Sequence, residues 1–201
     1  LLESQLRDAI EDYLSDEEHN IRIINISFGN IHEIWHTHYD RQFPLASLID
    51  ELAYNYPSIV FIVSAGNQHP LNCSYLDTID KIKDGYPRYL IDNPEFKLIN
   101  PATSALSLTV GSIAQPLDPL FDMYQREEIK TPIADSYQPS PFTRSGPGIN
   151  NMIKPEIVEL GGNLVLSNKL NRISEDNSGK LDVLNNEPTS GLFRRDYGTS
   201  F

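Results

Sequence analysis

The sequence is nearly devoid of cysteine, with Cys73 as its single example among 201 residues. An internal disulfide is therefore excluded, and the fold must be held by packing and hydrogen bonds alone. No Lys, Arg or His flanks Cys73 to stabilise a thiolate. We expect a small buried apolar side chain at this position rather than a nucleophile.

Long hydrophobic runs are also missing. No segment approaches the roughly 18 consecutive apolar residues that a membrane-spanning helix needs. Leu1 and Leu2 are followed at once by acidic residues instead of the apolar core of a signal peptide. The sequence thus predicts no membrane segment and no signal peptide within these residues, and it leaves the localisation open.

Positive charge is scarce, because 16 Lys and Arg stand against 28 Asp and Glu, for a formal net charge of -12. A nucleic-acid-binding surface needs clustered basic side chains to neutralise phosphates. The charge balance therefore argues against nucleic acid as a partner, and it disfavours anionic membranes for the same reason.

What is present is an ordinary globular composition, 39% hydrophobic and 22% charged, long enough for one full domain. Apolar spacing predicts an amphipathic helix over residues 2–14, a buried strand over 21–26, a second helix from Pro44 to just before Pro57, and a strand over 59–63. A strand–helix–strand unit at this spacing is a right-handed crossover, so the sheet is expected to be parallel. Further strands are predicted over residues 106–113 and 156–160.

The remaining segments are less regular. We expect a helix near residues 77–83, and we place the proline-punctuated residues 86–96 outside the core. Residues 115–140 hold four prolines and are predicted to form a long surface excursion. Residues 167–190, rich in Asn, Ser, Asp and Gly, are predicted to form a flexible loop or a hairpin.

Two short motifs carry the chemistry. Ser64-Ala65-Gly66-Asn67 closes the apolar run 59–63, and Gly198-Thr199-Ser200 lies near the end of the sequence. A strand ending in small residues and an Asn can aim a carboxamide donor at a developing oxyanion. A Gly-Thr-Ser turn can present a nucleophilic hydroxyl.

Further blocks appear in a fixed order along the chain. They are Ile24-Asn25-Ile26-Ser27-Phe28-Gly29, Asn100-Pro101-Ala102-Thr103 with residues 108–112, and Pro141–Pro147 with Lys154–Gly161. Together with the two motifs above, this order resembles the subtilisin-like serine proteases (subtilases). One departure is Glu159-Leu160-Gly161, which stands where that family usually has Ala-Pro-Gly.

The resemblance implies an α/β fold, a three-layer α/β/α arrangement with a mainly parallel sheet. It implies peptide-bond hydrolysis of a polypeptide substrate through an acyl-enzyme, with Ser200 as nucleophile and Asn67 as oxyanion-hole donor. The residues expected to line the substrate cleft are Ser27, Phe28, Gly29, Ser64, Ala65 and Gly66. No metal site is expected. Calcium is a possibility by resemblance only, since the acidic clusters 16–18 and 175–176 show no cage-like spacing.

The family's base and its orienting carboxylate are not found. They occur in H-G-T or H-G-H and D-S-G or D-T-G motifs, and none of the five His residues here is followed by Gly. We therefore expect residues 1–201 to be a partial peptidase domain that lacks the Asp and His segments upstream and the nucleophile helix downstream. Such a piece should be inactive alone, and it should expose apolar surface through which it could self-associate.

Two alternatives remain open. His32-Glu33-Ile34-Trp35-His36 satisfies the H-E-x-x-H pattern of zinc hydrolases, although that chemistry needs both His on one face of a helix. We favour a loop for this segment, with the His cluster as a polar rim near the cleft. The other alternative is a non-catalytic interaction domain built on a protease-like scaffold.

Overall fold

The computed structural model describes residues 2–15, 20–39, 41–116, 130–174, 178–185 and 191–200. Its helices are α1 (Leu2–Ser15), α2 (Pro44–Asn55), α3 (Ile79–Gly85) and α4 (Tyr89–Asp92), with short 3-10 turns at Pro70–Asn72, Pro94–Phe96 and Ile149–Asn151. Its strands are β1 (Ile23–Ile26), β2 (Asn30–Ile34), β3 (Val60–Ser64), β4 (Ile99–Asn100), β5 (Leu108–Ile113), β6 (Lys130–Pro132), β7 (Ile157–Leu160), β8 (Val165–Ser167), β9 (Arg172–Ile173), β10 (Leu181–Leu184) and β11 (Phe193–Asp196).

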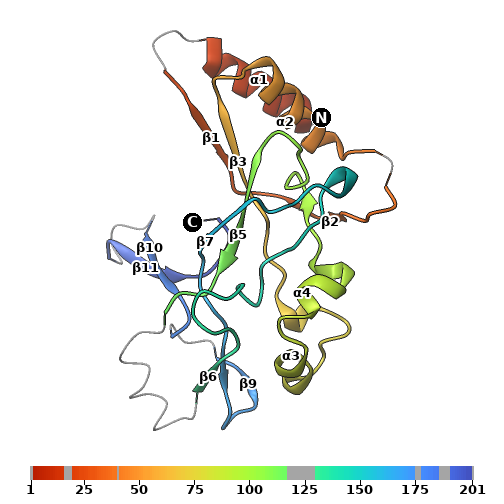
Figure 1. Cartoon of the computed structure of the whole chain (residues 1–201). Coiled ribbons are helices and arrows are strands. Elements are labelled where there is room, and N and C mark those ends of the chain that lie inside the picture. The colour runs from red at the N-terminus through yellow and green to blue at the C-terminus, as the bar shows by residue number, and fades with distance from the viewer. Residues whose placement is uncertain are drawn as a thin grey trace.

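A four-stranded parallel sheet in the order β1-β3-β5-β7 forms the centre of the fold. The crossover from β1 to β3 runs through α2, as the apolar spacing predicts. Figure 1 shows α1 and α2 side by side along β1 and β3, with α3 and α4 toward the other end of the strands. The predicted α/β class with a mainly parallel sheet is confirmed, and the arrangement is consistent with a subtilisin-like three-layer fold.

One face of the sheet packs against the two long helices. Phe61 and Val63 of β3 are buried on this face together with Ile26 of β1, which lies opposite Val63 in the register. Leu48 and Leu52 of α2 complete the cluster. Alternation along a strand sends every second side chain to the same face, so the other residues of β3 must point the opposite way.

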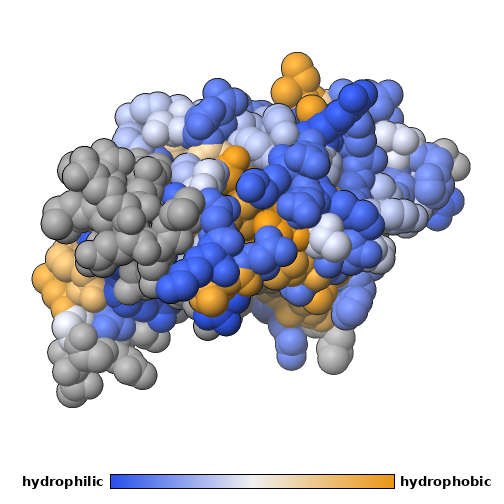
Figure 2. All heavy atoms as spheres, turned by 90° about the horizontal axis from the view of Figure 1, so that it is seen from below, coloured by the Kyte–Doolittle hydropathy of each residue, from blue (hydrophilic) through white to orange (hydrophobic). Residues whose placement is uncertain are grey.

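The opposite face is exposed toward the amino-terminal ends of the strands in the part of the chain that the structure describes, whereas Ser64 and Ser112 on the same face are buried. Ile23 and Val60 are paired partners on it and are 61% and 43% exposed, and Leu108 and Ile157 are 39% and 47% exposed. Parallel sheets normally bury both faces. The expectation of exposed apolar surface agrees with this face, while self-association through it stays a prediction. Figure 2 shows the molecule from below, where hydrophobic side chains interrupt a largely hydrophilic surface.

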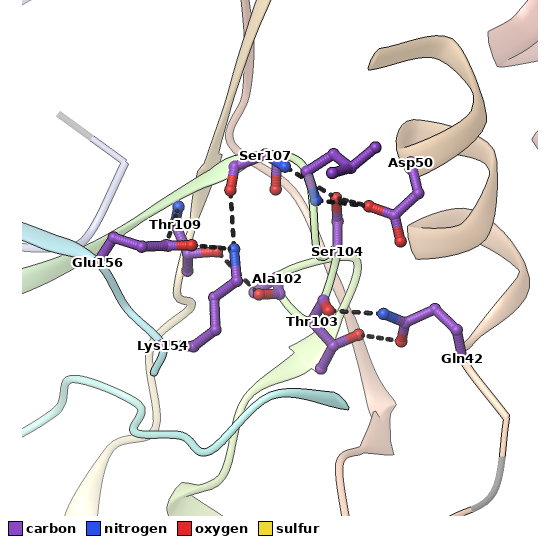
Figure 3. A network of polar contacts seen from close by, with 10 residues as sticks. Gln42, Asp50, Ala102, Thr103, Ser104, Ser107, Thr109, Lys154 and Glu156 are labelled. Atoms are coloured by element: carbon purple, nitrogen blue, oxygen red, sulfur yellow. Dashed lines mark hydrogen bonds and ion pairs between the residues drawn. The ribbon is translucent and has the colours of Figure 1, made fainter. Parts of the chain in front are cut away.

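A polar network fixes the amino-terminal end of β5 to its neighbours (Figure 3). Asp50 of α2 accepts hydrogen bonds from the Ser104 hydroxyl (2.7 Å) and the Leu106 N–H (2.8 Å). On the other side, the buried Lys154 ammonium donates to the Ser107 carbonyl at 2.8 Å and pairs with Glu156 at 2.5 Å. These bonds set the position of β5, so that the opposite, carboxyl-terminal ends of the strands are held in register.

A second apolar cluster corrects the prediction that residues 86–96 lie outside the core. Tyr89, Leu90 and Phe96 are buried there, and the Tyr89 hydroxyl donates to the Pro141 carbonyl at 2.8 Å. The prolines begin short helical turns instead of excluding the segment, because Pro is well accommodated at the first position of a helix. The predicted helix near residues 77–83 is confirmed as α3.

The other irregular segments are confirmed in part. Residues 167–190 contain β9, which pairs antiparallel with β8, and β10, whose antiparallel partner β11 lies beyond residue 190, so the hairpin alternative is borne out only in part. The surface excursion predicted for 115–140 is wrong for its second half, where β6 pairs with β8 and Ala134 and Ser140 are buried. Residues 117–129 lie outside the described residues. Within the described ranges, no helix has the length and hydrophobicity to cross a bilayer.

Two tyrosines of the second cluster make stability sensitive to alkaline pH. Burial raises the pKa of Tyr86 to about 12 and raises that of Tyr89 as well. In the unfolded chain these tyrosine hydroxyls titrate at about pH 10, so the folded state binds their protons more tightly. The stability that they contribute is complete below pH 10 and is lost as pH rises through the folded values.

Unfolding in urea between pH 9 and 12 should show this loss, and Tyr89→Phe should weaken it. Tyr54→Phe, at a position 78% exposed, is the control, and an unchanged pH slope in Tyr89→Phe would contradict the assignment.

Candidate active site at the carboxyl ends of the strands

The two segments predicted to line a substrate cleft leave the sheet at the same edge. Ile26 pairs with Val63, so residues 27–29 follow β1 beside residues 64–66, which are the last residue of β3 and the two after it. Residues 27–29 are exposed, with Phe28 at 46%. Ser64 and Ala65 are buried, and Gly66 turns the chain with a φ of +90°, a conformation that favours glycine.

Asn67 follows this turn and is exposed to solvent. Its backbone forms a bridge to Thr143, and the next N–H, that of Gln68, donates to the Phe142 carbonyl at 2.8 Å. The main chain at Asn67 is therefore tied down on the side of residues 142–143, which leaves the carboxamide to be directed by other partners.

The Gly198–Ser200 segment crosses the same edge of the sheet. Gly198 donates its N–H to the carbonyl of Gly161 at 2.8 Å, directly after β7. Gly161 in turn donates to the carbonyl of Ile113, the last residue of β5. A Cβ on Gly161 would collide with Ser112 and with the Gly198 carbonyl, so this crossing requires glycine there. The segment thus runs from the end of β7 toward the end of β3.

Thr199 joins the two motifs through a pair of hydrogen bonds. The Gly66 N–H donates to the Thr199 hydroxyl oxygen at 3.0 Å, and the Thr199 N–H donates to Oδ1 of Asn67 at 3.0 Å. Only the oxygen of a carboxamide can accept from an N–H, so this bond fixes which way the Asn67 side chain faces. Its NH₂ group remains available as a donor. Asn67 is thereby bonded to the residue that precedes Ser200, and Ser200 is exposed while Thr199 is buried.

The H-E-x-x-H segment is neither the loop that we favoured nor the helix that a zinc site needs. Residues Asn30–Ile34 form strand β2, which pairs antiparallel with β4. Strand alternation places His32 and Glu33 on opposite sides. The Glu33 carboxylate accepts from the Asn100 side chain at 2.5 Å. The ring of His36 stacks on that of His38 with centroids 5.4 Å apart. The segment therefore does not form the helix that would place both histidines of a zinc site on one face.

Histidine and acidic side chains elsewhere do not complete a site. Among the described residues, no hydrogen bond joins Ser200 to a histidine, and no group of three His, Cys, Asp or Glu side chains is placed to hold a metal ion. The half-buried His69 has its pKa lowered by burial, and its Nδ1 accepts from the Leu71 N–H. The clusters 16–18 and 175–176 considered for calcium lie outside the described residues.

Arg144 is a structural centre of the site that the sequence analysis did not single out. Its side chain is 1% exposed and donates to the carbonyls of Glu95 (2.9 Å) and Lys97 (2.8 Å) and to the Gln68 amide oxygen (2.9 Å). The backbone N–H of Arg144 also donates to the Gly66 carbonyl at 3.3 Å. Burial lowers the pKa of the guanidinium to about 10, so it stays charged near neutral pH. A lone cation between small and apolar residues, Phe142 to Pro147, is the signal that could have revealed it.

Cys73 is 2% exposed and accepts a hydrogen bond from the Asn93 amide at 2.9 Å. The prediction of a small buried side chain at this position is confirmed.

Comparison with known proteins decides the family. The model of the subtilase family matches residues 2–201. The chain belongs to the subtilase family. It is 34% identical over 201 residues to the uncharacterized protein y4bN of Sinorhizobium fredii (strain NBRC 101917 / NGR234), a match that covers 98% of this chain and 44% of that protein. This subtilase chain therefore spans less than half the length of that relative. No solved structure matches it.

Membership in this family supports the coarse functional assignment. Subtilases are serine proteases, hydrolases whose substrates are polypeptides. The resemblance drawn from five sequence blocks is thus confirmed at the level of the family, over nearly the whole chain.

Proposed function

We propose that this chain supplies the nucleophile, the oxyanion donor and part of the substrate cleft of a serine endopeptidase. The observation that carries the proposal is the pair of hydrogen bonds in which Thr199 accepts from the Gly66 N–H and donates to Oδ1 of Asn67. Thr199, the residue that precedes Ser200, is thereby bonded to the segment that follows β3. Without that coupling, Ser200 and Asn67 would be two separate loop residues.

Ser200 attacks the scissile carbonyl and forms a tetrahedral intermediate whose oxygen carries the negative charge. The Asn67 NH₂ group and the Ser200 backbone N–H donate to that oxygen. Because Oδ1 of Asn67 is already engaged by the Thr199 N–H, the carboxamide needs no reorientation as the charge develops. An extended substrate pairs with the backbone of residues 27–29 and 64–66.

The proton of the Ser200 hydroxyl must pass to a general base that a carboxylate orients. In the subtilase pattern this base is the His of an H-G-T or H-G-H segment, which residues 1–201 do not contain. The proposal therefore assigns the complete reaction to the full-length gene product, and residues 1–201 alone are expected to show no turnover.

Covalent capture tests the proposal directly. A fluorophosphonate probe reacts with activated serine nucleophiles, and the full-length gene product should take up one label that peptide mass spectrometry locates at Ser200. Ser200→Ala should abolish the label. Ser47→Ala, which removes an exposed serine of α2, should leave it unchanged. No label on the full-length product would favour the non-catalytic interaction domain instead, and a label that survives Ser200→Ala would show that another residue is the nucleophile.

A further inference from the structure

One apolar side chain lies between the two segments of the proposed substrate cleft. Ile99 is 4% exposed, and a Cβ built on Gly29 would stand only 2.8 Å from its Cδ1. A Cβ built on Gly66 would stand 3.0 Å from the same atom. A side chain at Gly29 would force the tip of Ile99 to move, and one at Gly66 would be tight against the same tip and strained by the φ of +90°. The tip of Ile99 therefore contacts both walls of the cleft at once.

The backbone around Ile99 is fixed on every side. β4 pairs with β2, and the Ile99 carbonyl accepts from the Ala102 N–H at 2.7 Å. The preceding residue, Leu98, donates to the Ser145 carbonyl at 3.0 Å and accepts from the Trp35 N–H at 2.7 Å. The side-chain Oδ1 of the following residue, Asn100, accepts from the Ala46 N–H at the start of α2 at 3.0 Å. The main chain that carries Ile99 cannot move away from the cleft without breaking several of these bonds.

Arg144 holds the same segment from behind. Its guanidinium binds the Lys97 carbonyl, two residues before Ile99, and its Cδ would lie 3.1 Å from a Cβ on Gly66. Gly66 is thus enclosed between Ile99 on one side and Arg144 on the other. The space between residues 27–29 and 64–66 therefore ends at a rigid apolar floor.

We infer that Ile99 is the residue that sets specificity, and that it restricts the residue before the scissile bond to a small uncharged side chain such as Gly, Ala or Ser. This inference rests on the proposed protease function. A substrate that pairs with residues 27–29 and 64–66 directs that side chain into the space between them. A methyl group ends above Ile99, whereas Leu or Phe would have to displace a packed side chain. Charged side chains are all larger than a methyl group, and Lys or Arg would in addition lie near the Arg144 cation, whose Cδ would stand 3.1 Å from a Cβ on Gly66.

The size of the effect follows from how strongly packed pockets discriminate. Adding or removing a single methylene in an apolar pocket changes kcat/KM by roughly 10- to 200-fold. We therefore expect the full-length gene product to cleave a peptide with Ala before the scissile bond at least about 10-fold more efficiently than matched peptides with Leu or Phe.

The test compares three peptides, identical except for Ala, Leu or Phe at that position, on the wild-type full-length product and on variants of Ile99. Ile99→Ala should raise kcat/KM for the Leu peptide by about 10-fold or more while changing the Ala peptide little. Ile99→Val removes only Cδ1, preserves most of the packing and should shift the preference in the same direction by a smaller factor. Ile31→Ala is the matched control, since Ile31 is 60% exposed on β2.

Three outcomes would overturn the inference. The wild type could prefer Leu or Phe, both Ile99 variants could keep the wild-type preference, or Ile31→Ala could change it equally. Failure of the proposed function looks different, because no peptide would then be cleaved and no phosphonate label would appear at Ser200. If Ile99→Ala does not fold, Ile99→Val alone decides the matter.

Discussion

Replacing Asn67 with leucine is expected to lower kcat of the full-length product by about 10²- to 10³-fold with little change in KM. Removing one oxyanion-hole donor has an effect of this size because the lost interaction forms only as charge develops on the substrate oxygen. Leucine has the same branched shape and number of side-chain heavy atoms as asparagine, and position 67 is exposed, so the fold should tolerate it even though the Thr199 N–H loses its acceptor.

Asn67→Asp separates the donor from the positioning role of the same side chain. An aspartate can still accept the Thr199 N–H, as Oδ1 of Asn67 does at 3.0 Å, but it offers no donor to the oxyanion. Its kcat should therefore fall at least as far as that of the leucine variant, because a carboxylate repels the developing charge. Steady-state kinetics with one peptide substrate measures both variants. A kcat within about 3-fold of wild type in either would remove Asn67 from the oxyanion hole.

The sequence was sufficient for those parts of the fold that local patterns determine. Apolar spacing located α1, α2 and the strands of the parallel sheet, because helices and buried strands leave distinct periodicities. It was wrong where tertiary context decides. The segment containing Tyr89 and Phe96 reads as an irregular, proline-rich stretch, yet it packs against residues 142 and 164, which lie far along the chain. The strand β2 likewise forms only because β4, some 65 residues later, offers it an edge.

The candidate site divides along the same line. Asn67 and Ser200 lie in short motifs, and the role of each could be predicted from its own motif. The residues that position them could not be predicted in this way. Thr199 could be read only as part of a motif, and its two bonds cross 133 and 132 positions of sequence. Ile99 looks like any core isoleucine until Gly29 and Gly66 are seen to close on it.

Arg144→Met is expected to lower the free energy of unfolding by about 3–5 kcal/mol. The substitution removes three hydrogen bonds from a charged donor and leaves the carbonyls of Glu95 and Lys97 and the Gln68 amide oxygen without that partner. Each buried acceptor left unpaired costs about 1–3 kcal/mol, and methionine recovers part of the loss by packing its apolar chain. Within the described residues, Nε of Arg144 already lacks a partner, so the guanidinium gives up no bond at that atom.

Urea unfolding of the full-length product measures the loss, with Arg88→Met as the matched control because the Arg88 side chain is 86% exposed. The control should change stability by less than about 0.5 kcal/mol. If the two substitutions lowered the free energy of unfolding equally, the buried hydrogen bonds of Arg144 would not be important for stability. Because the same guanidinium braces residues 95–97 below Ile99 and the main chain at Gly66, the Arg144 variant should also lose its preference for small side chains before the scissile bond. Arg144→Met should therefore lower both the free energy of unfolding and the preference for small side chains, whereas Arg88→Met should change neither.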